Sequence, residues 1–108
     1  MEILGTFEMA VMLAIVALSD DAYGRRILAE VSRSLDRDVA AGAVYATLDR
    51  LERKGLAVSV LAGATADRGG RAKRYFRLTG EGVATLNGTR AAMDRMWSLA
   101  PWPLPGGN

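Results

Sequence analysis

The sequence predicts one domain that is mainly α-helical and carries a small β-hairpin. Apolar residues recur at helical spacing in three successive segments and again toward the C-terminal end. Between residues 57 and 78 the apolar period shortens to two around a glycine-rich segment, which is typical of a hairpin. With 108 residues, 50% of them hydrophobic and 24% charged, the chain has the size and composition of a single globular domain.

The first two predicted helices cover residues 7 to 18 and 22 to 35. Thr6 can cap the first helix, and a polar segment at residues 19 to 21 separates the two. The first helix is apolar almost all round its axis, more than the core of a small domain can bury, so we expect a second chain to cover the remainder. The second helix is amphipathic, with an inner side formed by Tyr23, Ile27, Val31 and Leu35.

The third predicted helix covers residues 41 to 54 and ends before Gly55, a residue suited to a left-handed C-terminal cap. Its buried stripe is expected to contain Val44, Leu48 and Leu51. The opposite side carries small residues near its start and basic residues near its end, with Tyr45 on the flank. That side comprises Gly42, Ala46, Asp49, Arg50 and Arg53.

Two strands follow, over residues 57 to 61 and 73 to 78, joined by a segment rich in turn formers. Phe76 and Leu78 should face the core, and Lys73 should face away with the other odd-numbered residues of its strand. Basic residues crowd the tip of this hairpin. Those expected to contact a partner are Arg68, Arg71, Lys73 and Arg74.

The last predicted helix begins after its capping residue Thr79 and continues to about residue 98. An apolar seam along it, formed by Val83, Leu86, Met93 and Trp97, calls for a second helix to pack against. We therefore divide the single domain into residues 1–78, a dimerisation helix at residues 79–100, and a proline- and glycine-rich tail at residues 101–108 that we expect to be loosely ordered.

The charge is distributed unevenly along the chain. Residues 50 to 77 contain eight basic and two acidic side chains, so this segment has a net charge of +6 within a chain whose formal net charge is +2. A basic segment in an otherwise acidic molecule is typical of a surface that binds phosphates.

Composition also excludes several classes of function. The chain has no cysteine and no histidine, so thiolate zinc sites, thiol nucleophiles and imidazole bases are excluded, and we predict neither an enzyme, nor a metal site, nor a cofactor. The longest apolar run has ten residues, half the roughly 20 that a membrane span requires, so we expect no membrane association. The absence of cysteine fits a reducing cytoplasm, which is the location we expect.

The order of elements, three helices followed by a basic hairpin and a further helix, is that of a winged helix-turn-helix. The third helix would enter the major groove of DNA, and the hairpin, the wing of such folds, would reach along the backbone. At three places the sequence closely resembles the PadR family of transcriptional regulators. These are Tyr23-Gly24, the segment GAVYATLDRLERKGL at residues 42–56 and the segment RYFRLTGEG at residues 74–82.

The resemblance implies a homodimeric DNA-binding repressor of a kind that often responds to a ligand. It also implies dimerisation through the last helix against the first helix and their counterparts, with an interface formed by Phe7, Val11, Val83, Leu86, Met93 and Trp97. The operator would then be an inverted repeat, since a two-fold dimer presents two third helices to one face of the duplex. Family members often carry Ser or Thr at the start of the third helix, where this sequence has Ala40-Ala41.

The residues expected to contact double-stranded DNA combine the outer side of the third helix with the wing: Gly42, Tyr45, Ala46, Asp49, Arg50, Arg53, Arg68, Arg71, Lys73 and Arg74. Tyr45 could instead shield the joint between the second and third helices, and Arg50 and Arg53 could contact phosphates or bases. Met93 and Trp97 could form a pocket for a planar apolar effector or serve as interface core. The alternative function is a winged-helix adaptor that binds a protein and no DNA.

Overall fold

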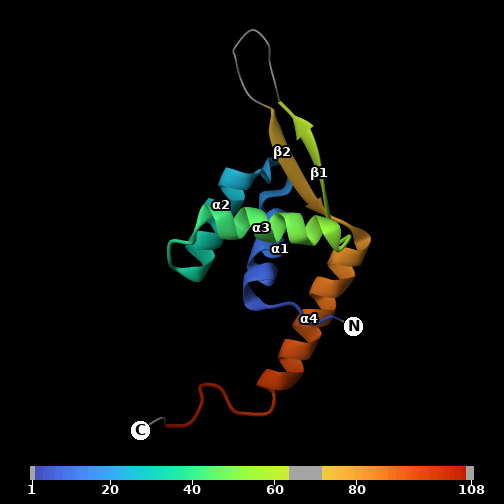
Figure 1. Ribbon diagram of the computed structural model, residues 1–108. Coiled ribbons are helices and arrows are strands. Elements are labelled where there is room, and N and C mark those ends of the chain that lie inside the picture. The colour runs from blue at the N-terminus through green and yellow to red at the C-terminus, as the bar shows by residue number, and fades with distance from the viewer. Residues whose placement is uncertain (1, 64–71, 107–108) are drawn as a thin grey trace.

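The computed structural model describes residues 2–63 and 72–106 of the chain. Within these residues it confirms the predicted mainly helical fold with a two-stranded hairpin. The molecule is elongated, 61 × 30 × 20 Å, with β1 and β2 projecting at one end and α4 leading away toward the other (Figure 1). In chain order the elements are α1 (Thr6–Leu18), a short 3-10 helix (Ser19–Asp21), α2 (Gly24–Leu35), α3 (Ala41–Arg53), β1 (Ala57–Ala62), β2 (Lys73–Leu78) and α4 (Gly80–Trp97).

The core forms where α1, α2 and α3 meet, and Phe76 of β2 closes one side of it. The stripes predicted for α2 and α3 point into this core, because their spacing of three and four residues keeps them on one side of each helix. Burial of these apolar side chains is the main force that holds the three helices together. The largest fully buried apolar side chains are Val11, Met12, Ile27, Val31, Val44, Leu48 and Leu51.

Two helix starts differ from the prediction. Gly5 is the N-cap of α1 and Thr6 is already helical, so the prediction that the Thr6 hydroxyl caps this helix is wrong. Helix α2 begins at Gly24, two residues later than predicted, because the preceding backbone pairs with the hairpin. Phe76 N donates to Ala22 O at 2.8 Å, and Tyr23 forms an isolated antiparallel bridge with Tyr75.

The hairpin pairs β1 and β2 antiparallel, in a register that runs from Ala57 opposite Leu78 to Ala62 opposite Lys73. Because side chains alternate along a strand, Arg74 shares a face with the buried Phe76, and Lys73 lies on the other face with Tyr75. The two adjacent cations at the start of β2 therefore point to opposite sides of the wing.

Helix α4 is attached to the turn between α3 and β1. As predicted, Thr79 caps it, since its Oγ1 accepts a hydrogen bond from Gly82 N at 2.9 Å. The same hydroxyl donates to Gly55 O at 2.7 Å, and Gly55 adopts the left-handed conformation expected of it, with φ of 77°. A Cβ at Gly82 would clash with the carbonyl oxygen of Leu56, so only glycine permits this close approach.

Candidate functional site

One side of α3 is exposed along its whole length, whereas Val44, Leu48 and Leu51 bury the opposite side. The start of this helix has no side-chain cap, because Ala40 is the N-cap residue. Small residues at this start keep the backbone accessible to a large partner. The exposed side contains the predicted residues Gly42, Tyr45, Ala46, Asp49 and Arg53.

A groove of about 630 Å³ lies between this side of α3, the start of α2 and the start of β2. Of the described residues that line it, three are cations and one, Asp49, is a carboxylate, so this lining has a net positive charge. Two of these cations, Lys73 and Arg74, were predicted from the sequence. The third, Arg25 of α2, was missed, because its place on the outer side of an amphipathic helix gave no sign that it borders α3 and the wing. Among the described residues, the lining comprises Tyr23, Gly24, Arg25, Tyr45, Leu48, Asp49, Ala72, Lys73, Arg74 and Phe76.

Hydrogen bonds and ring contacts hold the wing cations in place. The Lys73 ammonium lies 4.3 Å from the centre of the Tyr23 ring, which in turn packs edge-on against Tyr75 with 5.6 Å between ring centroids. The Arg74 guanidinium donates to Ser59 Oγ at 3.0 Å, and Ser59 donates to Glu52 of α3 at 2.7 Å. The wing is thus connected to both helices that border the groove.

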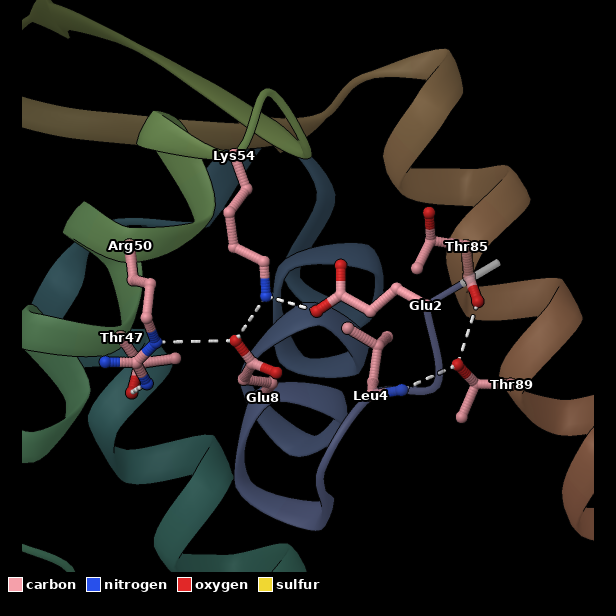
Figure 2. Close-up of polar contacts among 8 residues, drawn as sticks. All are labelled: Glu2, Leu4, Glu8, Thr47, Arg50, Lys54, Thr85 and Thr89. Carbon is pink, nitrogen blue, oxygen red and sulfur yellow. Dashed lines mark hydrogen bonds and ion pairs between the residues drawn. The ribbon is translucent and has the colours of Figure 1, made fainter.

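Arg50 lies at the edge of the exposed side of α3, where its side chain is 48% exposed and faces α1. Its Nε is 3.4 Å from Glu8 Oε2 of α1, and its guanidinium also donates to Thr47 Oγ1 at 3.2 Å (Figure 2). Thr47 is buried, so these contacts join the Arg50 side chain to the part of α3 that faces α1. Of the two arginines predicted to contact DNA, Arg50 thus has an acidic partner within the chain.

Lys54, which follows α3, joins the same cluster. Its Nζ is 2.9 Å from Glu8 Oε2 and also contacts Glu2 (Figure 2). Burial by itself would raise the pKa of Glu8, but Lys54 and Arg50 outweigh it and hold that pKa below its ordinary value of 4.5. The hydrogen bonds to Glu2 and then to Glu8 raise the pKa of Lys54 above 10.5. This cluster could not be predicted from the sequence, because the residues that pair in it are separated by 42 to 52 positions along the chain.

The residues predicted for a dimer interface have different environments. Val11 is fully buried in the core of its own chain, so we correct its assignment to an interface. Leu86 is partly buried against the same core, Phe7 and Met93 are half-buried, and Val83 and Trp97 are exposed. Large apolar side chains that the sequence analysis did not select are also exposed, namely Leu13, Val16 and Met96.

The tip of the wing, including Arg68 and Arg71, lies outside the described residues. Among the residues that the structure does describe, no group of three carboxylate, cysteine or histidine side chains could hold a metal ion. The described helices also include none with the length and apolar character that crossing a membrane requires.

Comparison with known proteins assigns this fold to a family. Residues 12–88 match the model of the transcriptional regulator PadR-like family, which is most of the chain. The chain belongs to this family. Its members are DNA-binding transcription regulators and generally not enzymes. No curated protein sequence is significantly similar to the chain.

Solved structures of PadR-like regulators share the fold. A PadR-like transcription factor from Bacteroides fragilis superimposes with a TM-score of 0.72 at 25% identity, with 88% of this chain and 86% of that chain covered. A PadR family regulator from Eggerthella lenta gives a TM-score of 0.65 at 25% identity, covering 82% of this chain and 74% of that one. The fold also matches a mutant of S. aureus MepR bound to an oligodeoxyribonucleotide, with a TM-score of 0.62, 16% identity, and coverage of 89% and 62%.

Proposed function

We propose that this PadR-like chain is a repressor that binds an inverted-repeat DNA operator as a homodimer. The observation that carries the proposal is the positive groove between α3 and the wing, which continues onto the exposed side of α3. A surface of this kind fits a duplex, because a helix can enter the major groove while flanking cations lie on the phosphates. The MepR neighbour, whose fold is similar, was solved with an oligodeoxyribonucleotide bound.

The side chains of the groove suggest how the duplex is contacted. Arg53, Lys73 and Arg74 are exposed cations, and in this proposal they contact phosphates on either side of the major groove. Asp49 would be repelled by phosphates, so its favourable partner is a donor on a base edge such as the amino group of cytosine. Near the start of α3, Gly42 and Ala46 permit close approach to the bases.

The apolar surfaces of α1 and α4 support the homodimer. Leu13 and Val16 of α1 are 51% and 55% exposed, and Val83 and Trp97 of α4 are 47% and 53% exposed. Covering such side chains with a second copy would remove them from water, which favours association. A two-fold dimer places its two α3 helices about one turn of DNA apart, so we expect half-sites separated by roughly 10 base pairs.

A second candidate function, release from DNA by a planar apolar effector, is favoured by one feature of α4. A pocket of about 300 Å³ is lined by Trp97 and by Trp102 of the tail, whose rings are 5.5 Å apart and nearly perpendicular. Met93, which the sequence analysis grouped with Trp97, is not among the lining residues. Saturable quenching of tryptophan fluorescence by planar aromatic compounds, lost in Trp97→Leu, would support this role, and failure across a broad panel would oppose it.

Selection of duplexes from a random-sequence library by the purified protein tests the proposed function. We expect an inverted repeat to emerge and its affinity to fall steeply with salt, because several phosphates would be neutralised. Reporter transcription from a promoter that carries the selected site should decrease in the cytoplasm of cells that express the protein. Failure to enrich any duplex would instead favour the adaptor function.

A further inference from the structure

Two carboxylates of the N-terminal segment, which we define as residues 2–8 and which includes the start of α1, neutralise two cations at the end of α3. Glu8 lies between Arg50 and Lys54 and contacts both, and Glu2 contacts Lys54 from the other side (Figure 2). The Glu8 side chain is 15% exposed and that of Lys54 is 30% exposed, so this cluster is partly sheltered from water. An ion pair in such a position is stronger than an isolated pair on the open surface.

The same N-terminal segment is also attached to α4. Leu4 N donates to Thr89 Oγ1 at 3.1 Å, and this hydroxyl donates to Thr85 O at 2.9 Å. Thr89 and Leu4 are both buried, so water cannot replace this hydrogen bond without cost. Figure 2 shows the segment running between α3 and α4, with the Glu8 contacts on one side and the Thr89 contact on the other.

These contacts hold the C-terminal half of α3, which the core by itself fixes only on one side. On the inner side of α3, Val44, Leu48 and Leu51 are buried in the core. The first turn of α3 lacks a side-chain cap. Side-chain hydrogen bonds hold its C-terminal half at two places, to Glu8 through Arg50 and to the hairpin through Glu52. Lys54 adds a third, immediately after the helix. Small rotations of a helix in the major groove displace every base contact at once, so this end of α3 needs a fixed position.

We propose that Glu8, assisted by Glu2, is a positioning residue for DNA recognition, which it serves by holding Arg50 and Lys54 and thereby fixing α3 against the N-terminal segment and α4. Arg50 and Lys54 then belong to the internal structure of the protein and not to its contacts with phosphate. This inference rests on the proposed DNA-binding function of α3. The lowered pKa of Glu8 is consistent with it, because the carboxylate is stabilised despite its burial.

The opposing view is that Arg50 and Lys54 bind phosphates and that Glu8 only reduces their attraction. The two views predict opposite effects of Glu8→Gln on binding to the duplex selected by the unaltered protein. If Glu8 positions α3, the ratio of affinity for that duplex to affinity for a scrambled duplex of equal length falls about tenfold. If Glu8 only opposes phosphate binding, the variant binds both duplexes more tightly and the ratio stays constant.

Lys54→Gln tests the proposal from the other side of the ion pair and remains informative if Glu8→Gln does not fold. Positioning predicts a similar fall in the affinity ratio with an unchanged dependence of affinity on salt. A phosphate contact predicts equal losses on both duplexes and a salt slope smaller by about one per protomer. The matched control is Glu30→Gln, because Glu30 also pairs with an arginine, and its partner among the described residues is Arg33 of its own helix.

Fluorescence anisotropy with labelled duplexes, on variants shown by thermal unfolding to be folded, supplies the readout. A reduced ratio in Glu8→Gln or Lys54→Gln, with Glu30→Gln unchanged, supports the inference. If the ratio of affinity for the selected duplex to affinity for the scrambled duplex stays constant, the inference is wrong, whether both affinities rise, fall or stay the same. The proposed function fails separately, if the unaltered protein selects no duplex or if Arg53→Ala changes no affinity.

Discussion

Gly24 lies directly against the ring of Tyr45. A Cβ at this position would clash with Cε1 of the ring, so the start of α2 and the exposed side of α3 meet without space for a side chain. Tyr45 is nonetheless 47% exposed. It therefore shields the joint between the two helices, which is one of the alternatives that the sequence left open. It also presents part of its ring to the groove, and its contact with DNA stays a prediction.

Gly24→Ala should displace the Tyr45 ring and lower the free energy of unfolding by about 1–3 kcal/mol, as overpacking typically does. In a Tyr45→Ala background the same substitution should cost much less, because the clash is gone. Gly80→Ala is the control, since Gly80 also opens a helix and a Cβ there would meet no heavy atom within 4 Å. Urea denaturation measures the stability of each variant, and an equal cost of Gly24→Ala in both backgrounds would contradict the clash.

Arg53→Ala and Arg74→Ala should each weaken binding about equally for the selected and scrambled duplexes and reduce the salt slope by about one per protomer, because phosphate contacts carry no sequence information. Arg95→Ala, in the last turn of α4, changes the same charge and should have little effect. Titrations at several salt concentrations measure the slopes. A loss of about 1–3 kcal/mol confined to the selected duplex would instead assign Arg53 to a base.

Thr89→Val should lower the free energy of unfolding by about 1–3 kcal/mol, because the buried Leu4 N–H would lose its acceptor while side-chain volume is retained. Thr89→Ser keeps the hydroxyl and should retain this hydrogen bond. Hydrogen exchange at Leu4 distinguishes the two variants, with faster exchange expected only in Thr89→Val. Equal exchange rates in both would show that this bond does not hold the N-terminal segment.

The Glu8 cluster should make stability depend on pH. Because the pKa of Glu8 is lower in the folded chain than its ordinary value of 4.5, the ion pairs contribute fully above that value, and their contribution is lost as the pH falls through the folded pKa. The difference in unfolding free energy between the unaltered protein and Glu8→Gln should therefore be largest near neutral pH and shrink on acidification. Denaturation curves at neutral pH and at a pH below the folded pKa measure it, and a difference independent of pH would contradict the ion pairing.

Leu13→Glu and Val83→Glu should each dissociate the proposed dimer, because a charge would have to be buried at the interface. Val60→Glu is the matched control, since Val60 is 61% exposed on the wing and lies in an element outside the proposed interface. Sedimentation equilibrium at micromolar concentration gives the molecular mass. A dimer that persists in both variants would exclude these surfaces as the interface.

The elements of the fold could be predicted from the sequence because their signals are local. The stripe of Val44, Leu48 and Leu51, the cap at Thr79 and the cap at Gly55 each depend on residues within one or two helical turns. The start of α2 could not be predicted in this way, because the backbone of Ala22 and Tyr23 pairs with β2, which lies far along the chain. At this position the hydrogen bond from Phe76 N to Ala22 O outweighs the local tendency of the segment to form a helix.

The sequence by itself determined the order of elements, the exposed side of α3 and the basic character of the segment that contains its C-terminal end, because helical spacing and charge are written along the chain. Only the tertiary structure decided which of these cations have an acidic partner within the chain. Arg50 and Arg53 lie in the same turn of α3, yet Arg50 is paired with Glu8, which is 42 residues away. Arg25, from another helix, borders the groove. Charge and spacing are properties of the chain, whereas the pairing of charges depends on which surfaces folding brings together.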